Sequence, residues 1–85
     1  MIEQAVIEKE VHKNGPRAAG IHYRRSYMRA SGKLQRTRLY SPTDLAAQAR
    51  LQNQMDDAWE AMRYIAATYF PQELQEILLA PLEEL

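Results

Sequence analysis

The residues best suited to binding chemistry are arginines and tyrosines that alternate between positions 21 and 40. Ser31-Gly32 has the composition of a two-residue hairpin loop, which would place residue 25 opposite 38 and residue 27 opposite 36. Since strand side chains alternate between faces, one face of this ribbon would collect the arginines and tyrosines together. Its members, with Leu34, are Tyr23, Arg25, Tyr27, Arg29, Arg36, Arg38 and Tyr40.

Such a face could bind an anion. Arg25 opposite Arg38 places like charges across the ladder, which costs stability unless an anion lies between them. Guanidinium groups match phosphate oxygens in bidentate fashion, and tyrosine rings can stack on unpaired bases. The pattern therefore predicts a basic hairpin that binds nucleic acid, with arginines on phosphates. A loop one residue longer or shorter would exchange the two faces.

Other uses of these side chains stay open. Tyr23, Tyr27 and Tyr40 could be core residues with arginine stems along them, or the arginines could pair with the protein's own carboxylates, within one chain or across a dimer. A different class of function also fits: a regulatory or inhibitor protein, of the kind phages and plasmids encode. It would bind a host protein or nucleoprotein complex through its charged surfaces.

Charge is divided between the two halves of the chain. Residues 1–42 contain nine basic and three acidic side chains, whereas residues 43–85 contain two basic and eight acidic ones. The formal net charge of zero therefore conceals a dipolar molecule, and such asymmetry indicates binding to an oppositely charged surface.

The elements that would position these residues are three strands followed by two helices. Val and Ile within Ile2–Lys13 favour a strand, although Asn14-Gly15-Pro16 is also typical of a helix end. The hairpin would span Ile21–Tyr40. Ser41 offers an N-cap for a long helix that ends near Phe70, before Pro71.

Pro71 would open a second, shorter helix that Pro81 ends. We therefore expect an α+β fold, a small antiparallel three-stranded sheet followed by one long and one short helix packed on one face. The 85 residues suit a single domain, 1–85. Its parts would be a basic sheet half (1–42), an acidic helical half (43–80) and a tail (81–85).

The long helix carries an apolar stripe with two interpretations. Its spacing fits two heptads and could form a dimer or partner interface, although ordinary core packing explains it too. The stripe residues are Met55, Trp59, Met62 and Tyr69. Asp56, Asp57 and Glu60 lie within about one turn, as solvated helical charge or as a cation site. An exposed acidic helix could alternatively imitate nucleic-acid phosphates.

Several features are missing from the sequence. It has no cysteine and no Gly-rich phosphate loop, and its two histidines, His12 and His22, stand apart. We therefore expect no enzyme activity, no metal and no cofactor. No signal peptide or membrane-spanning run is apparent, so we expect a cytoplasmic protein. We also expect a homodimer, because so short a chain buries little surface alone.

Overall fold

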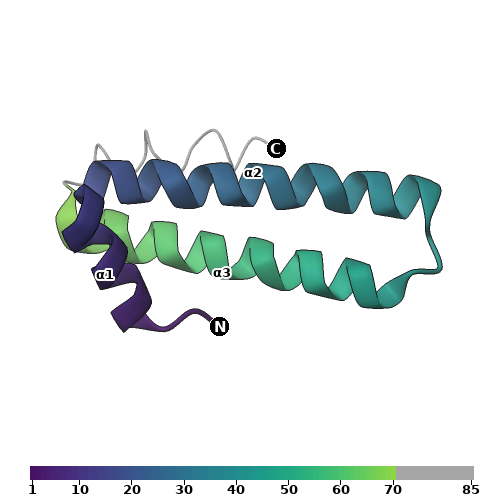
Figure 1. Ribbon diagram of the computed structural model, residues 1–85, viewed down its shortest axis with the longest axis horizontal. Helices are drawn as coiled ribbons and strands as arrows, with labels where there is room; N and C mark the ends of the chain where they lie inside the picture. The colour runs from purple at the N-terminus through teal and green to yellow at the C-terminus, as the bar shows by residue number, and fades with distance from the viewer. Residues whose placement is uncertain (71–85) are drawn as a thin grey trace.

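The fold is all-helical over residues 1–70, the part of the chain that the computed structural model describes. It contains α1 (Gln4–Asn14), α2 (Pro16–Tyr40) and α3 (Leu45–Tyr69), and no strand in this range. The long helices α2 and α3 lie side by side, and α1 packs where α2 begins and α3 ends (Figure 1). The expected α+β fold with a three-stranded sheet is therefore wrong.

The first segment is a helix where the sequence indicated a strand. Ile7 and Val11, one turn apart, are its buried side chains. Gly15 ends α1 with φ 87° and ψ 157°, and its backbone N–H donates to the carbonyl oxygen of Val11 at 2.7 Å. Pro16 is then the first residue of α2. Asn14-Gly15-Pro16 thus separates two helices, because glycine reaches this backbone conformation readily and proline suits a helix start.

The predicted hairpin is instead one uninterrupted helix. Ser31 and Gly32 lie inside α2, and Gly15 is the only glycine with positive φ among the described residues. Helical spacing explains why: residues three, four or seven apart share a side of a helix. The buried residues of α2 follow that spacing and pack towards α3: Ala19, Gly20, Tyr23, Ala30 and Leu34.

The long helix α3 confirms the sequence prediction, with a different cap. Asp44 is its N-cap, and the Asp44 carboxylate accepts a hydrogen bond from the backbone N–H of Ala47 at 3.1 Å. Ser41, the predicted N-cap, follows the last turn of α2, where its N–H donates to the carbonyl of Thr37 at 2.8 Å. The second predicted helix, 71–80, lies outside the described residues.

Small side chains form much of the contact between the two long helices. Ala19 and Ala30 of α2 and Ala58 and Ala61 of α3 are all buried. Alanines let helix backbones approach closely, since crossing distances depend on the side chains at the contact. The bulky fully buried residues, Met62 and Ile65, come from α3. This contact takes the inner side of α2, so its polar and charged residues face outward.

Substitutions at Gly32 and Gly15 test the helical assignment of Ser31-Gly32. Gly32→Ala should raise the free energy of unfolding by about 0.5–1 kcal/mol, because alanine favours a helix interior over glycine. A Cβ there would meet only the Arg36 Nη1 atom, at 3.8 Å. Gly15→Ala should instead lower it by about 1–3 kcal/mol, since φ 87° strains any other residue. Urea titrations measure both. Destabilisation by Gly32→Ala would favour a turn at this position.

Candidate functional site

Helix α2 carries most of the positive charge in the protein. Its 25 residues include no aspartate or glutamate. The cations are Arg17, Arg24, Arg25, Arg29, Lys33, Arg36 and Arg38. A helix of this length spans about 38 Å, so α2 presents an extended positive surface and not a single charged point.

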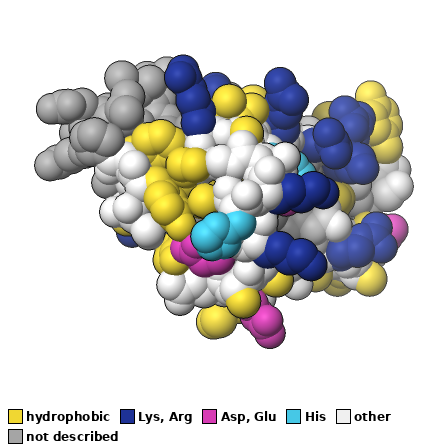
Figure 2. Space-filling view, turned by 60° about the vertical axis from the view of Figure 1, so that its left-hand side comes forward, with side chains coloured by type: hydrophobic (Ala, Val, Ile, Leu, Met, Phe, Trp, Pro, Cys, Tyr) yellow, Lys and Arg dark blue, Asp and Glu magenta, His cyan; other side chains and the backbone are white. Residues whose placement is uncertain are grey.

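Four of these cations share one side of the helix. Arg25, Arg29 and Lys33 follow at intervals of four residues, and Arg36 comes three later. All four are exposed. Neighbouring positions three and four apart lie about 5–6 Å from each other on a helix, so the charges repel. In Figure 2, many of the Lys and Arg side chains gather over the upper and right-hand parts of the molecule.

No carboxylate among the described residues neutralises this surface. The ion pairs there join the Met1 amino group to Asp57 at 3.0 Å and His12 to Glu8 at 3.9 Å, and neither involves α2. Each like-charged neighbour costs about 0.2–0.5 kcal/mol of helix stability. The alternative in which the arginines pair with carboxylates of the same chain is therefore not seen over residues 1–70.

A hollow between α2 and α3 extends the cationic side towards α3. Its volume is about 300 Å³, and three cations line it, Lys33 and Arg36 from α2 and Arg50 from α3. Guanidinium groups from facing helices can hold a carboxylate or phosphate between them. Arg50 therefore belongs to the candidate site, although its position in the acidic half of the sequence gave no signal of this.

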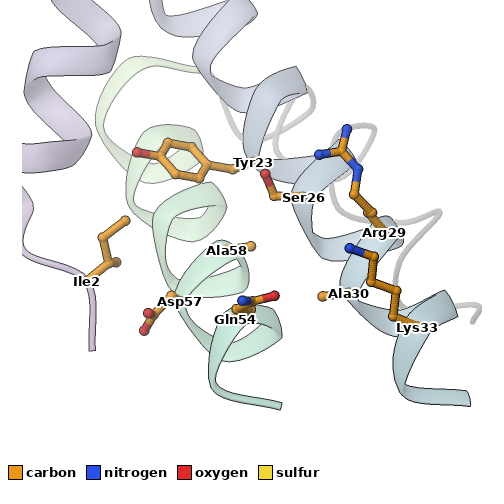
Figure 3. A pocket seen from close by; sticks show the side chains of 9 residues that line it. All are labelled: Ile2, Tyr23, Ser26, Arg29, Ala30, Lys33, Gln54, Asp57 and Ala58. Carbon is orange, nitrogen blue, oxygen red and sulfur yellow. The ribbon is translucent and has the colours of Figure 1, made fainter. Parts of the chain in front are cut away.

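A neighbouring hollow of about 330 Å³ is more apolar. Ile2, Tyr23, Ala30 and Ala58 contribute apolar atoms to its lining. Figure 3 shows Arg29 and Lys33 on the α2 side and Asp57 on the α3 side. Because the Met1 amino group pairs with Asp57, the cations of α2 remain the unneutralised charges of this hollow among the described residues.

Two of the three tyrosines of the predicted Arg/Tyr face are turned towards the core, away from the exposed arginines. Tyr23 is only 8% exposed, and burial raises the pKa of its phenol. Tyr27 is partly buried, with its ring 6.0 Å from that of Trp59 between centroids. Tyr40, at the end of α2, is 82% exposed. The hairpin that would have aligned them is absent from the described residues, so nucleic-acid binding through it is ruled out.

The residues of the predicted interface stripe on α3 likewise differ in how far they are buried. Met62 is fully buried in the protein's own core, and Trp59 packs against that core. Met55 is partly buried, while Tyr69 is exposed at the end of the helix. These positions leave little of the stripe open to a second copy. The homodimer itself stays a prediction.

A polar cluster between α1 and α3 was not foreseen from the sequence. The Glu8 carboxylate accepts hydrogen bonds from the hydroxyls of Tyr64 and Tyr69, the latter at 2.5 Å. The side-chain amide of Gln4 donates to the Tyr64 hydroxyl at 2.8 Å. Sequence offered no signal, because the partners are 56 and 61 residues apart from Glu8. These hydrogen bonds connect α1 to the end of α3.

Hydrogen bonding shifts the pKa values of both Glu8 and Tyr69. The two tyrosine hydroxyls hold the pKa of Glu8 below its usual range, since they stabilise the carboxylate. The bond to Glu8 raises the pKa of Tyr69 to about 12. A carboxylate that accepts hydrogen bonds from two phenol hydroxyls has the character of a structural contact, because these bonds join α1 to α3.

Neither a metal-binding cluster nor a relationship to a known family is found for the described residues 1–70. Over residues 1–70, His, Asp and Glu form no group of three that could hold a metal ion. No helix in that range is long and apolar enough to cross a membrane. Comparisons with family models, curated proteins and solved structures found no match. The site must therefore be interpreted from its own chemistry.

The Glu8 cluster predicts a loss of stability in acid. Because the pKa of Glu8 is lowered on folding, its contribution is present above the unfolded value of about 4.3 and disappears as pH falls through the folded value. Glu8→Gln should therefore destabilise the protein at pH 7 and flatten the decline in urea midpoint below pH 5. Glu60→Gln on α3, which removes an exposed carboxylate elsewhere, serves as the control. Equal acid sensitivity of the Glu8→Gln variant and the wild type would contradict this role.

Proposed function

We propose that this chain is a non-catalytic binding protein that uses the cations of α2 to bind a negatively charged macromolecular partner. One observation supports this most: α2 has seven cations and no carboxylate, and none of the seven forms an ion pair over residues 1–70. A helix that served only the fold would gain stability by interspersing glutamates among them.

The arrangement suits recognition better than catalysis. The cations extend along one helix, and the hollows beside them open to solvent between α2 and α3 without a nucleophile and base in contact. A surface of one charge sign accelerates encounter with an oppositely charged partner and sets orientation. Absence of enzyme activity stays a prediction, as does a cytoplasmic location.

Charge reversal on α2 tests the proposal. Arg25→Glu/Arg29→Glu should weaken binding of the full chain to fluorescein-labelled poly-L-glutamate by about tenfold at low salt, because two favourable charges become repulsive. Fluorescence anisotropy measures the affinity, which should also fall for the wild type as salt rises.

The matched control is Lys13→Glu/Arg63→Glu, which changes net charge equally at exposed positions on α1 and α3. Binding should weaken much less in this variant. If both double variants lose affinity equally, net charge and not α2 governs the interaction, and the proposal fails.

A further inference from the structure

The outward side of α2 bears exposed apolar residues that the core does not use. Ile21 is 40% exposed, Met28 43% and Leu39 74%. With Gly32 they fall at intervals of seven, four and seven residues. We name Ile21, Met28, Gly32 and Leu39 the outer ridge. These intervals are those of the a and d positions in a heptad repeat, whose residues meet a second helix.

Gly32 is the unusual member of the outer ridge. It lies in the interior of α2 with ordinary helical backbone, where alanine would be more stable. The described structure gives no steric reason for it, since an added Cβ would meet only the flexible end of Arg36, at 3.8 Å. Glycine permits close approach of another backbone. A partner helix that crosses α2 at Gly32 would account for it.

Cations flank the outer ridge on both sides. At about 3.6 residues per turn, Arg17 and Arg24 lie along one flank, and Arg25 and Arg36 along the other. Figure 2 shows yellow side chains next to dark blue ones along its upper edge. An apolar centre with a charged border is the usual anatomy of a protein interface. Carboxylates are the complementary partners for this border.

A further hollow lies beside the outer ridge. Its volume is about 320 Å³, and the described residues that line it include Ile21, Arg25 and Arg29. An acidic side chain from a partner helix would find a guanidinium there, with its methylene groups against Ile21. The hollow thus repeats, on a small scale, the combination of apolar surface and positive charge.

We propose that the outer ridge of α2 binds an acidic amphipathic helix of a protein partner. The partner's apolar residues would pack on Ile21, Met28 and Leu39, its backbone would approach at Gly32, and its carboxylates would meet the flanking arginines. This inference rests on the proposed function and specifies the partner of the same surface.

Other occupants match the outer ridge less well. A second copy meeting α2 with its own α2 would bring together two helices of seven cations each. The charged backbone of a nucleic-acid duplex would gain no favourable contact from exposed Ile21 and Met28. A helix that lies in a membrane surface needs a broad apolar face, whereas an a/d pattern is the narrower seam of helix pairing.

The test uses a labelled heptad peptide with Leu at a and d and Glu at e and g. The glutamates repel one another, so the free peptide does not pair with itself. By anisotropy, the full chain should bind this peptide at least about tenfold more tightly than poly-L-glutamate, because apolar contacts add to charge. The same peptide with Lys at e and g should not bind.

Substitution at Gly32 separates the outer ridge from general charge attraction. Gly32→Leu should weaken binding of the acidic heptad peptide by about tenfold, because its side chain blocks close approach, and should leave poly-L-glutamate binding unchanged. Asn53→Leu, which adds the same side chain at an exposed position on α3, is the matched control. Circular dichroism and urea midpoints verify that both variants remain folded.

The outcomes distinguish this inference from the proposed function. If poly-L-glutamate binds through α2 but the acidic heptad peptide binds no more tightly, or Gly32→Leu has no effect on it, the helix partner is excluded and the proposed function stands. If duplex DNA or phosphatidylserine vesicles bind and lose affinity in Gly32→Leu while the acidic peptide does not, a different class of partner occupies the outer ridge. Loss of all α2-dependent binding would remove both proposals.

Discussion

The contact between α2 and α3 is the constraint on which the other features depend. Buried alanines such as Ala19 and Ala61 let the two helices lie close together, and Met62 and Ile65 fill the space that remains. Since this contact uses one side of α2, the cations must occupy the others. The helix contact therefore determines that the charged residues of α2 point away from the core, while the sequence makes that charge positive.

Such a small core needs support at its ends, and α1 supplies it. Ile7 and Val11 join the same apolar cluster as Tyr23 and Met62. The Glu8 cluster then adds a polar contact to the end of α3, where two tyrosine hydroxyls meet one carboxylate. Because the Glu8 carboxylate is hydrogen-bonded within this contact, it does not neutralise the cations of α2, which form no ion pair over residues 1–70.

Residues 21–40 show how one segment can satisfy two periodicities. Tyr23, Arg25, Tyr27 and Arg29 alternate as in a strand, yet Tyr23 and Tyr27 are also one helical turn apart. Local propensity does not decide between them, and Ser31-Gly32 favours the wrong prediction of a turn because glycine often occupies one. Packing against α3 favoured the helix, since Ala19, Tyr23, Ala30 and Leu34 can be buried together only with helical spacing. The strand predicted at Ile2–Lys13 was wrong for a similar reason: burial of Ile7 and Val11 on one side outweighed the β-preference of valine and isoleucine.

Residue types alone were enough to find the unequal division of charge, the existence of α3 and its end before Pro71, and the absence of cysteine chemistry. These properties depend on composition or on signals within a few residues. The folded chain was needed to show that Tyr23 is buried while Arg25 and Arg29 are exposed, that Arg50 joins Lys33 and Arg36, and that Glu8 meets Tyr64 and Tyr69. Each of these relations depends on which side of a helix faces its neighbour, and that side is selected by the burial of apolar surface across the whole domain.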